Sequence, residues 1–232
     1  MKKSTVGSRA GGMASKTGTR RKPRRPAVPD YLPKALDALA YWVHYQNLRY
    51  SGRILTEGGI VDEMAALLQG FAHDQDVYLE VPFKKALTAS TDSQKRFDIV
   101  VVRHTTGKPG QFNKNDVECI IEVKRGQTTQ SNDHKAFEDD LKRLHDEVAK
   151  SAAHHRPQAY VVVVYQGSGA TERLLKRFAS KASSPAKLNT DIWGTKSELK
   201  TADGVAYWVR RSACARRNSR HSATVVFLLQ PV

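Results

Sequence analysis

The sequence predicts an α/β protein in which a mixed sheet is flanked by helices, preceded by a disordered basic N-terminal tail. Apolar, strand-like segments alternate with segments of helical periodicity, and two of the strands are joined by a Gly- and Pro-rich connection typical of a hairpin. Residues 1–28 are rich in Gly, Ser, Thr, Lys, Arg and Pro, a composition typical of disorder. Residues 29–232 are therefore expected to form one folded domain whose sheet is mixed and covered by helices.

Two amphipathic helices are expected at the start of this domain. The first begins near Asp30, a residue type that favours helix N-caps, and its apolar positions recur at helical spacing: Leu32, Leu36, Leu39 and Val43. The second covers about 57–71, with an apolar stripe made of Ile60, Met64, Leu67, Leu68 and Phe71. At about 100° per residue, Glu57 lies some 40° from the centre of that stripe and Glu63 about 80° from it. Glu57 is thus expected to point toward the core, with Glu63 as the alternative, although an acid at a helix start is also favoured by the helix dipole alone.

Strands are expected at 77–83, 96–103, 117–124 and 159–165, followed by two late strands, "VAYWVRR" and "ATVVFLLQ". The helix between the third and fourth strands should bury Phe137, Leu141, Leu144 and Val148. Its acidic run Glu138-Asp139-Asp140 is expected on the solvated face, balanced by Lys142 and Arg143. A further helix is expected at about 170–180.

Charged residues interrupt two of these strands. Asp98 stands inside "RFDIVVVR", and in "VECIIEVKRG" Glu122 and Lys124 share one face while Val123 points to the other. If these strands pair about a centre near Gly110, positions whose numbers sum to 220 face each other, which places Asp98 opposite Glu122. A slip of one residue would turn the two acids to opposite faces.

Such a cluster has two interpretations. Converging carboxylates raise one another's pKa unless a cation neutralises them, and hard oxygen ligands suit Mg²⁺ or Mn²⁺. A neighbouring lysine can then orient or deprotonate a bound water and stabilise charge that develops at phosphorus, which would allow phosphodiester hydrolysis. The alternative is a structural ion pair at the end of a strand.

The motif "RFDIVVV…IIEVK" resembles the core of the PD-(D/E)XK nuclease superfamily, which includes restriction endonucleases, Holliday junction resolvases and DNA-repair nucleases. Asp98 matches the strand aspartate of that family, although Phe97 replaces the proline. Glu122-Val123-Lys124 matches the (D/E)XK tripeptide, and "LTEGGIVDEMAALL" is similar to the first helix, with Glu57 as its glutamate. The resemblance covers about residues 57–165 and implies a restriction-endonuclease-like fold, with residues 166–232 as a C-terminal extension. It also implies that Asp98, Glu122 and the Val123 carbonyl bind Mg²⁺, for which Mn²⁺ substitutes. Glu57 would complete the site and Lys124 would position the attacking water.

The net charge of +15 indicates a polyanionic partner. Residues 1–29 carry nine Lys and Arg and no acid, which leaves +6 for the rest of the chain. A second basic patch without acids consists of Arg210, Arg211, Arg216, Arg217 and Arg220. The residues expected to contact nucleic acid are Arg20, Arg21, Arg24, Arg25, Arg125, Arg216 and Arg217.

We therefore expect a metal-dependent endonuclease that cuts DNA, of the restriction or defence type, for which a homodimer would allow both strands to be cut. A junction-resolving or repair nuclease, or a nucleic-acid-binding protein without catalysis, remains the alternative. No membrane partner is expected, because no apolar run approaches the roughly 20 residues of a membrane helix. Two cysteines without a CxxC pair, and the lack of a signal-peptide pattern, favour a reducing, cytoplasmic setting.

Overall fold

The structure is a computed structural model, and the residues it describes begin at Ala27. It describes residues 27–50, 55–87, 90, 93–104, 111–126, 132–151, 156–166, 199–200, 206–216 and 223–231, with the backbone alone at 132–137, 166, 199–200, 206–216, 223, 225 and 227. The tail up to residue 26 and the helix predicted at about 170–180 lie outside these ranges. Val28, which the sequence analysis assigned to the tail, packs against the core.

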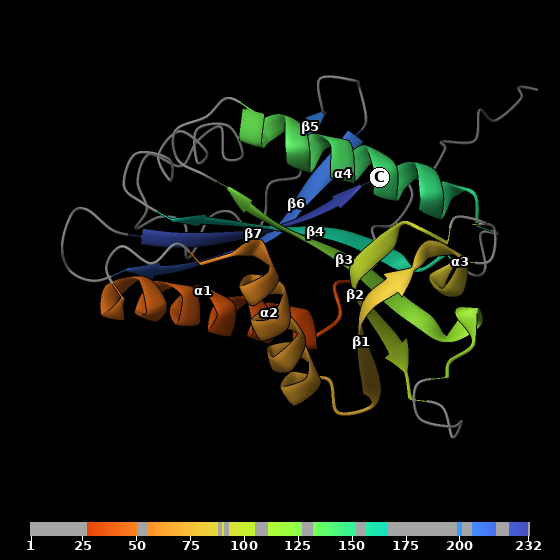
Figure 1. Ribbon diagram of the computed structural model, residues 1–232, viewed down its shortest axis with the longest axis horizontal. Helices are drawn as coiled ribbons and strands as arrows, with labels where there is room; N and C mark the ends of the chain where they lie inside the picture. Colours follow the sequence, from red (N-terminus) through yellow and green to blue (C-terminus); the bar gives the residue numbers. More distant parts are fainter. Residues whose placement is uncertain are drawn as a thin grey trace, which may run out of the picture.

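One mixed sheet of seven strands forms the middle of the molecule, with the order β1-β2-β3-β4-β7-β6-β5 (Figure 1). Its strands are β1 (Gln75–Pro82), β2 (Arg96–Arg103), β3 (Val117–Gly126), β4 (Gln158–Gln166), β5 (Leu199–Lys200), β6 (Ala206–Arg216) and β7 (Ala223–Pro231). β3 and β4 are parallel, and every other neighbouring pair is antiparallel. Because β7 pairs directly with β4, the late strands extend the same sheet, and Val226, Leu228 and Leu229 of β7 belong to its apolar cores.

Helices cover both faces of this sheet. They are α1 (Tyr31–Arg49), α2 (Glu57–Phe71), α3 (Phe83–Ala86) and α4 (Asn132–Ala149), and a 3₁₀ turn, η1 (Lys114–Asp116), precedes β3. α1 and α2 lie on one face and α4 lies across the other (Figure 1). Each face has its own apolar core, one against α1 and α2, the other against α3 and α4. Among the described helices, none combines the length and the apolar character that crossing a membrane requires.

The local predictions agree closely with these elements. α2 and β2 have the predicted bounds, and the four leucine and valine positions predicted for α1 are buried. At the start of α1, however, Asp30 makes no side-chain cap hydrogen bond. Thr56 does cap α2, since its side chain accepts a hydrogen bond from the Gly59 amide at 3.1 Å. This cap fixes the first turn of α2, the turn that carries Glu57.

The predicted hairpin register is confirmed. Ile99 faces Ile121, Val100 faces Ile120 and Val101 faces Cys119, so each pair sums to 220, until a bulge shifts the register beyond Val101. Asp98 and Glu122 occupy the next position of the same register. Val123 belongs to the core under α1 and α2, whereas Ile120 belongs to the core under α4. Glu122 and Lys124, which alternate with Val123, therefore face the α4 side of the sheet.

Candidate active site

The site lies where β2 and β3 cease to pair. The paired residues of this ladder end at Ile99 and Ile121, so the next backbone amides of β3 need other acceptors. The Asp98 carboxylate accepts the hydrogen bond of the Val123 amide, with a distance of 2.7 Å from N to Oδ2. In an antiparallel pair the N–H and C=O of one residue point to the same neighbour, so the Val123 carbonyl faces the same side as Asp98.

Glu57 reaches the same region from the first turn of α2. Its Oε1 lies 2.9 Å from Nζ of Lys124, and its Oε2 accepts a hydrogen bond from the Arg125 amide at 3.2 Å. The structure thus brings Glu57, and not the alternative Glu63, to the (D/E)XK-like tripeptide. Asp98 and Glu57 thus accept hydrogen bonds from backbone amides of β3 that a neighbouring strand would otherwise accept. Both carboxylates also place negative charge beside Lys124.

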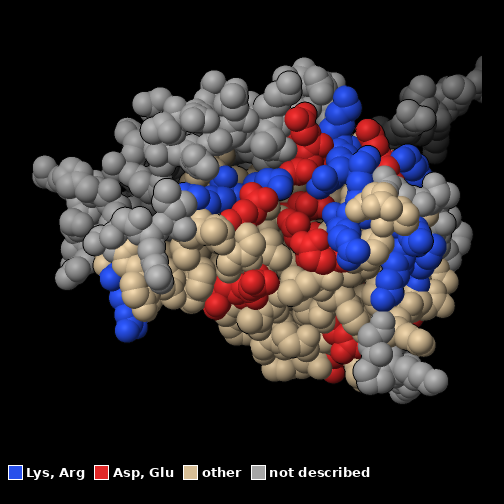
Figure 2. All heavy atoms as spheres, viewed as in Figure 1, with Lys and Arg blue, Asp and Glu red and all other residues tan. Residues whose placement is uncertain are grey.

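Helix α4 contributes two residues that the sequence analysis did not place here. Arg143 Nη2 lies 2.9 Å from Glu122 Oε2 and 2.8 Å from Asp140 Oδ1. Lys124 Nζ lies 3.4 Å from Asp140 Oδ2, an ion-pair distance without hydrogen-bond geometry. Figure 2, drawn in the same view as Figure 1, shows acidic and basic side chains close together from the region of α4 down across the middle of the molecule.

The prediction that Glu138-Asp139-Asp140 forms a solvated face was therefore wrong in part. Asp139 is exposed, but Glu138 and Asp140 are buried. The same helical-wheel measure that singled out Glu57 places Asp140 about 70° from the centre of the α4 stripe. This angle is close to that of Glu63, so the periodicity of the sequence does not distinguish a buried from an exposed acid at position 140.

Glu122 is the most deeply buried acid of the cluster, at 2% exposure. Burial raises its pKa, Asp98 raises it further, and Arg143 opposes both, so that its pKa is about 9. Its Oε1 has no hydrogen-bond partner among the described residues. Burial also raises the pKa of Asp98, despite the hydrogen bond from Val123 and the nearby Lys124. These are two adjacent acids that lack sufficient positive charge.

Lys124 has the opposite balance. Burial by itself would lower the pKa of its amine, but Asp140 and then Glu57 more than compensate, and the pKa is raised. Lys124 is accordingly a stable cation at neutral pH, held between one carboxylate on α2 and one on α4.

A further acid, Glu80 of β1, lies near Asp98. In the β1–β2 pairing Leu79 faces Ile99 and Val81 faces Phe97, so Glu80 stands opposite Asp98. Glu80 adopts a positive φ of 51°, which breaks the regular ladder, and Arg96 donates a hydrogen bond of 2.7 Å to its carbonyl. Glu57, Glu80 and Asp98, together with Asp62, line a hollow of about 180 Å³. The sequence gives no sign of this backbone conformation.

The residues present suit a hard divalent cation. The unpartnered Glu122 Oε1 beside Asp98 is the kind of oxygen pair that Mg²⁺ or Mn²⁺ neutralises. In the described part of the chain, no three His, Cys, Asp or Glu side chains form a group that could hold a metal ion. The protein would therefore supply two carboxylates and the Val123 carbonyl, leaving the remaining positions to water and substrate oxygens, as is common for Mg²⁺.

The predicted nucleic-acid contacts are only partly within the described residues. Arg20, Arg21, Arg24, Arg25 and Arg217 lie outside them, and Arg216 is described by its backbone in β6. Arg125 directly follows Lys124, is half-buried, and its Nε has no hydrogen-bond partner among the described residues.

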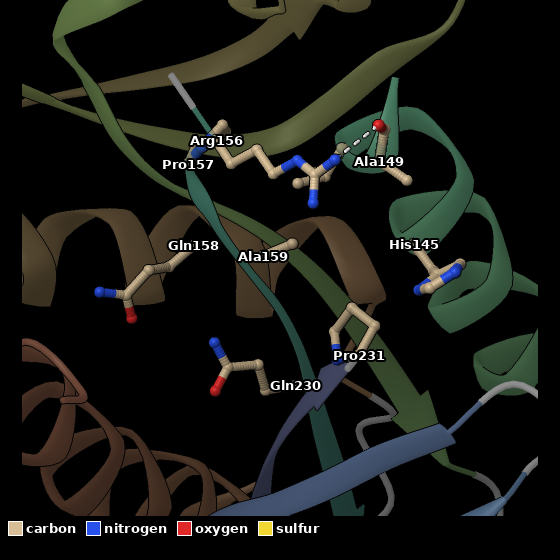
Figure 3. A pocket seen from close by; sticks show the side chains of 9 residues that line it. His145, Ala149, Arg156, Pro157, Gln158, Ala159, Gln230 and Pro231 are labelled. Carbon is tan, nitrogen blue, oxygen red and sulfur yellow. Dashed lines mark hydrogen bonds between the residues drawn. The ribbon is translucent and has the colours of Figure 1, made fainter. Parts of the chain in front are cut away.

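A larger hollow of about 370 Å³ lies by the C-terminal end of α4 (Figure 3). Its lining residues include His145 and Val148 of α4, Arg156 just before β4, Gln158 of β4 and Gln230 of β7. Its described lining residues include no carboxylate, and Arg156 donates a hydrogen bond to the Ala149 carbonyl at 3.1 Å, which caps the helix. This hollow does not supply the chemistry of the carboxylate cluster.

Comparisons of the chain with protein-family models, with curated proteins and with solved structures found no match.

Proposed function

We propose that this protein is a divalent-metal-dependent endonuclease that hydrolyses phosphodiester bonds of DNA, of the restriction or defence type. The observation that carries the proposal is the convergence of Asp98, Glu122 and Lys124 with Glu57 at the end of the β2–β3 ladder. A buried acid pair beside a lysine has little structural benefit, because ionising it costs free energy. Acids with perturbed pKa values are typical of catalytic sites, and one of the two, Asp98, lines a hollow.

The arrangement of elements is consistent with a PD-(D/E)XK nuclease. A helix with a glutamate, α2, precedes three antiparallel strands, and the helix α4 then leads to a strand parallel to the third. This order supports a restriction-endonuclease-like fold as the proposed finer classification. The likeness rests on topology and on the positions of four residues, without a matching relative.

In the proposed mechanism, Asp98, Glu122 and the Val123 carbonyl hold Mg²⁺, with Mn²⁺ as a substitute. The bound ion would supply Lewis-acid stabilisation of charge at phosphorus and a more acidic water. Lys124 holds its ammonium beside the reacting atoms and orients the attacking water. Glu57 restrains that ammonium and, through the Arg125 amide, keeps the end of β3 in place.

The rival proposal is a nucleic-acid-binding protein without catalysis. The specific observation in its favour is that Asp98 and Glu57 accept hydrogen bonds from β3 amides, a structural role that would explain their positions. This role accounts for Glu122 only in part, because Arg143 pairs with its Oε2 while its buried Oε1 has no hydrogen-bond partner among the described residues. Both proposals expect the basic segments to bind DNA through salt-sensitive phosphate contacts.

Cleavage of supercoiled plasmid tests the proposal. We expect nicked or linear product from the full chain with Mg²⁺ and none with EDTA. Asp98→Asn and Lys124→Ala should lower the rate at least about 100-fold while leaving gel-shift binding intact. The matched control is Asp74→Asn, an exposed acid in the turn before β1. Linear, branched and genomic DNA, and RNA, should be compared, because a resolving or repair nuclease would prefer branched or damaged DNA. Equal cleavage by Asp98→Asn would refute the proposed site, and DNA binding without cleavage of any of these substrates would favour the rival.

A further inference from the structure

Asp140 and Arg143 are not among the residues on which the proposed mechanism rests, yet each contacts one of those residues. Arg143 binds Glu122 and Asp140 at once, at 2.9 Å and 2.8 Å. Asp140 in turn lies 3.4 Å from Lys124. The pair, which occupies one turn of α4, therefore connects to both ends of the Glu122-Val123-Lys124 tripeptide.

The charges of this cluster are not balanced. Glu57, Asp98, Glu122 and Asp140 provide four carboxylates, whereas Lys124 and Arg143 provide two cations. Lys124 forms ion pairs with Glu57 and Asp140, whereas the cation paired with Glu122 in the described residues is Arg143. When all six of these groups are ionised, as the binding of a cation would favour, they carry an excess of two negative charges, which equals the charge of one divalent cation.

Arg143 has contacts that would retain it near the site without Glu122. Asp140 is its second acceptor, and its guanidinium lies 5.7 Å from the centre of the Phe83 ring. About a third of its side chain is exposed, so it can shift without being buried elsewhere. Glu122, in contrast, is fixed by its strand and almost completely buried.

From these contacts we propose that Arg143 is a positioning residue that holds the Glu122 carboxyl group in the ion-free protein and gives up this contact when a divalent cation binds, while Arg143 stays paired with Asp140. This inference rests on the proposed metal site. It implies that the ion competes with Arg143 for Glu122, so that removal of the guanidinium strengthens ion binding. A merely structural ion pair would not have this effect.

The test is calorimetric titration of the full chain with Mn²⁺, without DNA. A neighbouring unit charge changes the pKa of a carboxyl group by about 1–3 units, and a similar effect on a cation would make Arg143→Gln bind Mn²⁺ about tenfold more tightly or more. Arg143→Lys, which keeps the charge, should remain near wild type. Lys142→Gln is the matched control, since it removes an exposed charge from the position of α4 that directly precedes Arg143.

Glu122→Gln separates the two possible failures. If wild type binds Mn²⁺ and Glu122→Gln does not, the metal site stands, and unchanged or weaker binding by Arg143→Gln overturns the role of Arg143 alone. If wild type and Glu122→Gln show no binding, or the same binding, the metal site and this inference both fail. Circular dichroism monitors folding of each variant. Should Arg143→Gln not fold, Arg143→Met, whose stem can still pack on Phe83, gives the same comparison.

Discussion

Replacing Glu122 by glutamine should make the ion-free protein more stable at neutral pH, although it removes the residue most central to the proposed chemistry. Burial raises the pKa of Glu122 from 4.5 to about 9, so the folded protein keeps a proton that the unfolded chain loses. A carboxyl group whose pKa is raised on folding loses stability as pH rises, here through the window from about 4.5 to 9. Glutamine has nearly the same shape and does not titrate.

The size of the effect follows from that window. At 1.36 kcal/mol per pH unit, three units between 4.5 and pH 7.5 correspond to about 4 kcal/mol at most. Between pH 5 and pH 7.5 the wild type should therefore lose about 3 kcal/mol relative to Glu122→Gln. Below about pH 9 the Glu122 carboxyl group is protonated in the folded protein, so the substitution gives Arg143 another neutral partner there and leaves this difference in pH dependence.

Urea denaturation at pH 5, 6, 7.5 and 8.5, with EDTA present, measures this difference. Glu118→Gln, the same substitution at a half-buried position of β3, is the matched control and should follow the wild type. Mg²⁺ should stabilise the wild type more at pH 8.5 than at pH 6, because the ion replaces a proton, and should not stabilise Glu122→Gln. Parallel stability curves for wild type and Glu122→Gln would refute the reasoning, since they would show that Glu122 ionises as easily in the folded protein as in the unfolded chain.

Three further changes test other parts of the molecule. Gly126→Ala should lower the free energy of unfolding by about 1–3 kcal/mol in urea, because a Cβ there would lie 1.9 Å from the Tyr165 ring; an unchanged midpoint would contradict this packing. His44 is buried, and burial lowers its pKa, so the free energy of unfolding should fall as pH drops below about 6.5. His44→Leu should reduce this loss of stability, and an equal loss in both proteins would rule out His44 as its source. Deleting residues 1–26 removes nine basic side chains and should reduce the slope of log affinity against log salt by up to about 8 for duplex DNA; an unchanged slope would exclude the tail from binding.

The local pattern of the sequence determined most of the helices and strands, and it also predicted the part of the site formed by Asp98, Glu122 and Glu57. Periods of 3.6 and 2 are properties of single segments, so α2 and β2 could be predicted to the residue. The hairpin between β2 and β3 is also local, and its symmetry sufficed to predict that Asp98 stands beside Glu122. Glu57 could be predicted because its angle to the apolar stripe follows from the sequence of one helix.

Contacts between elements distant in the chain were decided by the tertiary structure. Arg143 and Asp140 resemble an ordinary charged helix surface until α4 packs across β3 and brings them to Glu122 and Lys124. The joining of β7 to β4, and the positive φ of Glu80, likewise have no local signature. The sequence specifies which groups carry charge. Their distances, and hence the raised pKa of Glu122, depend on how the helices and the sheet pack together, because burial and Coulomb interactions act through space and not along the chain.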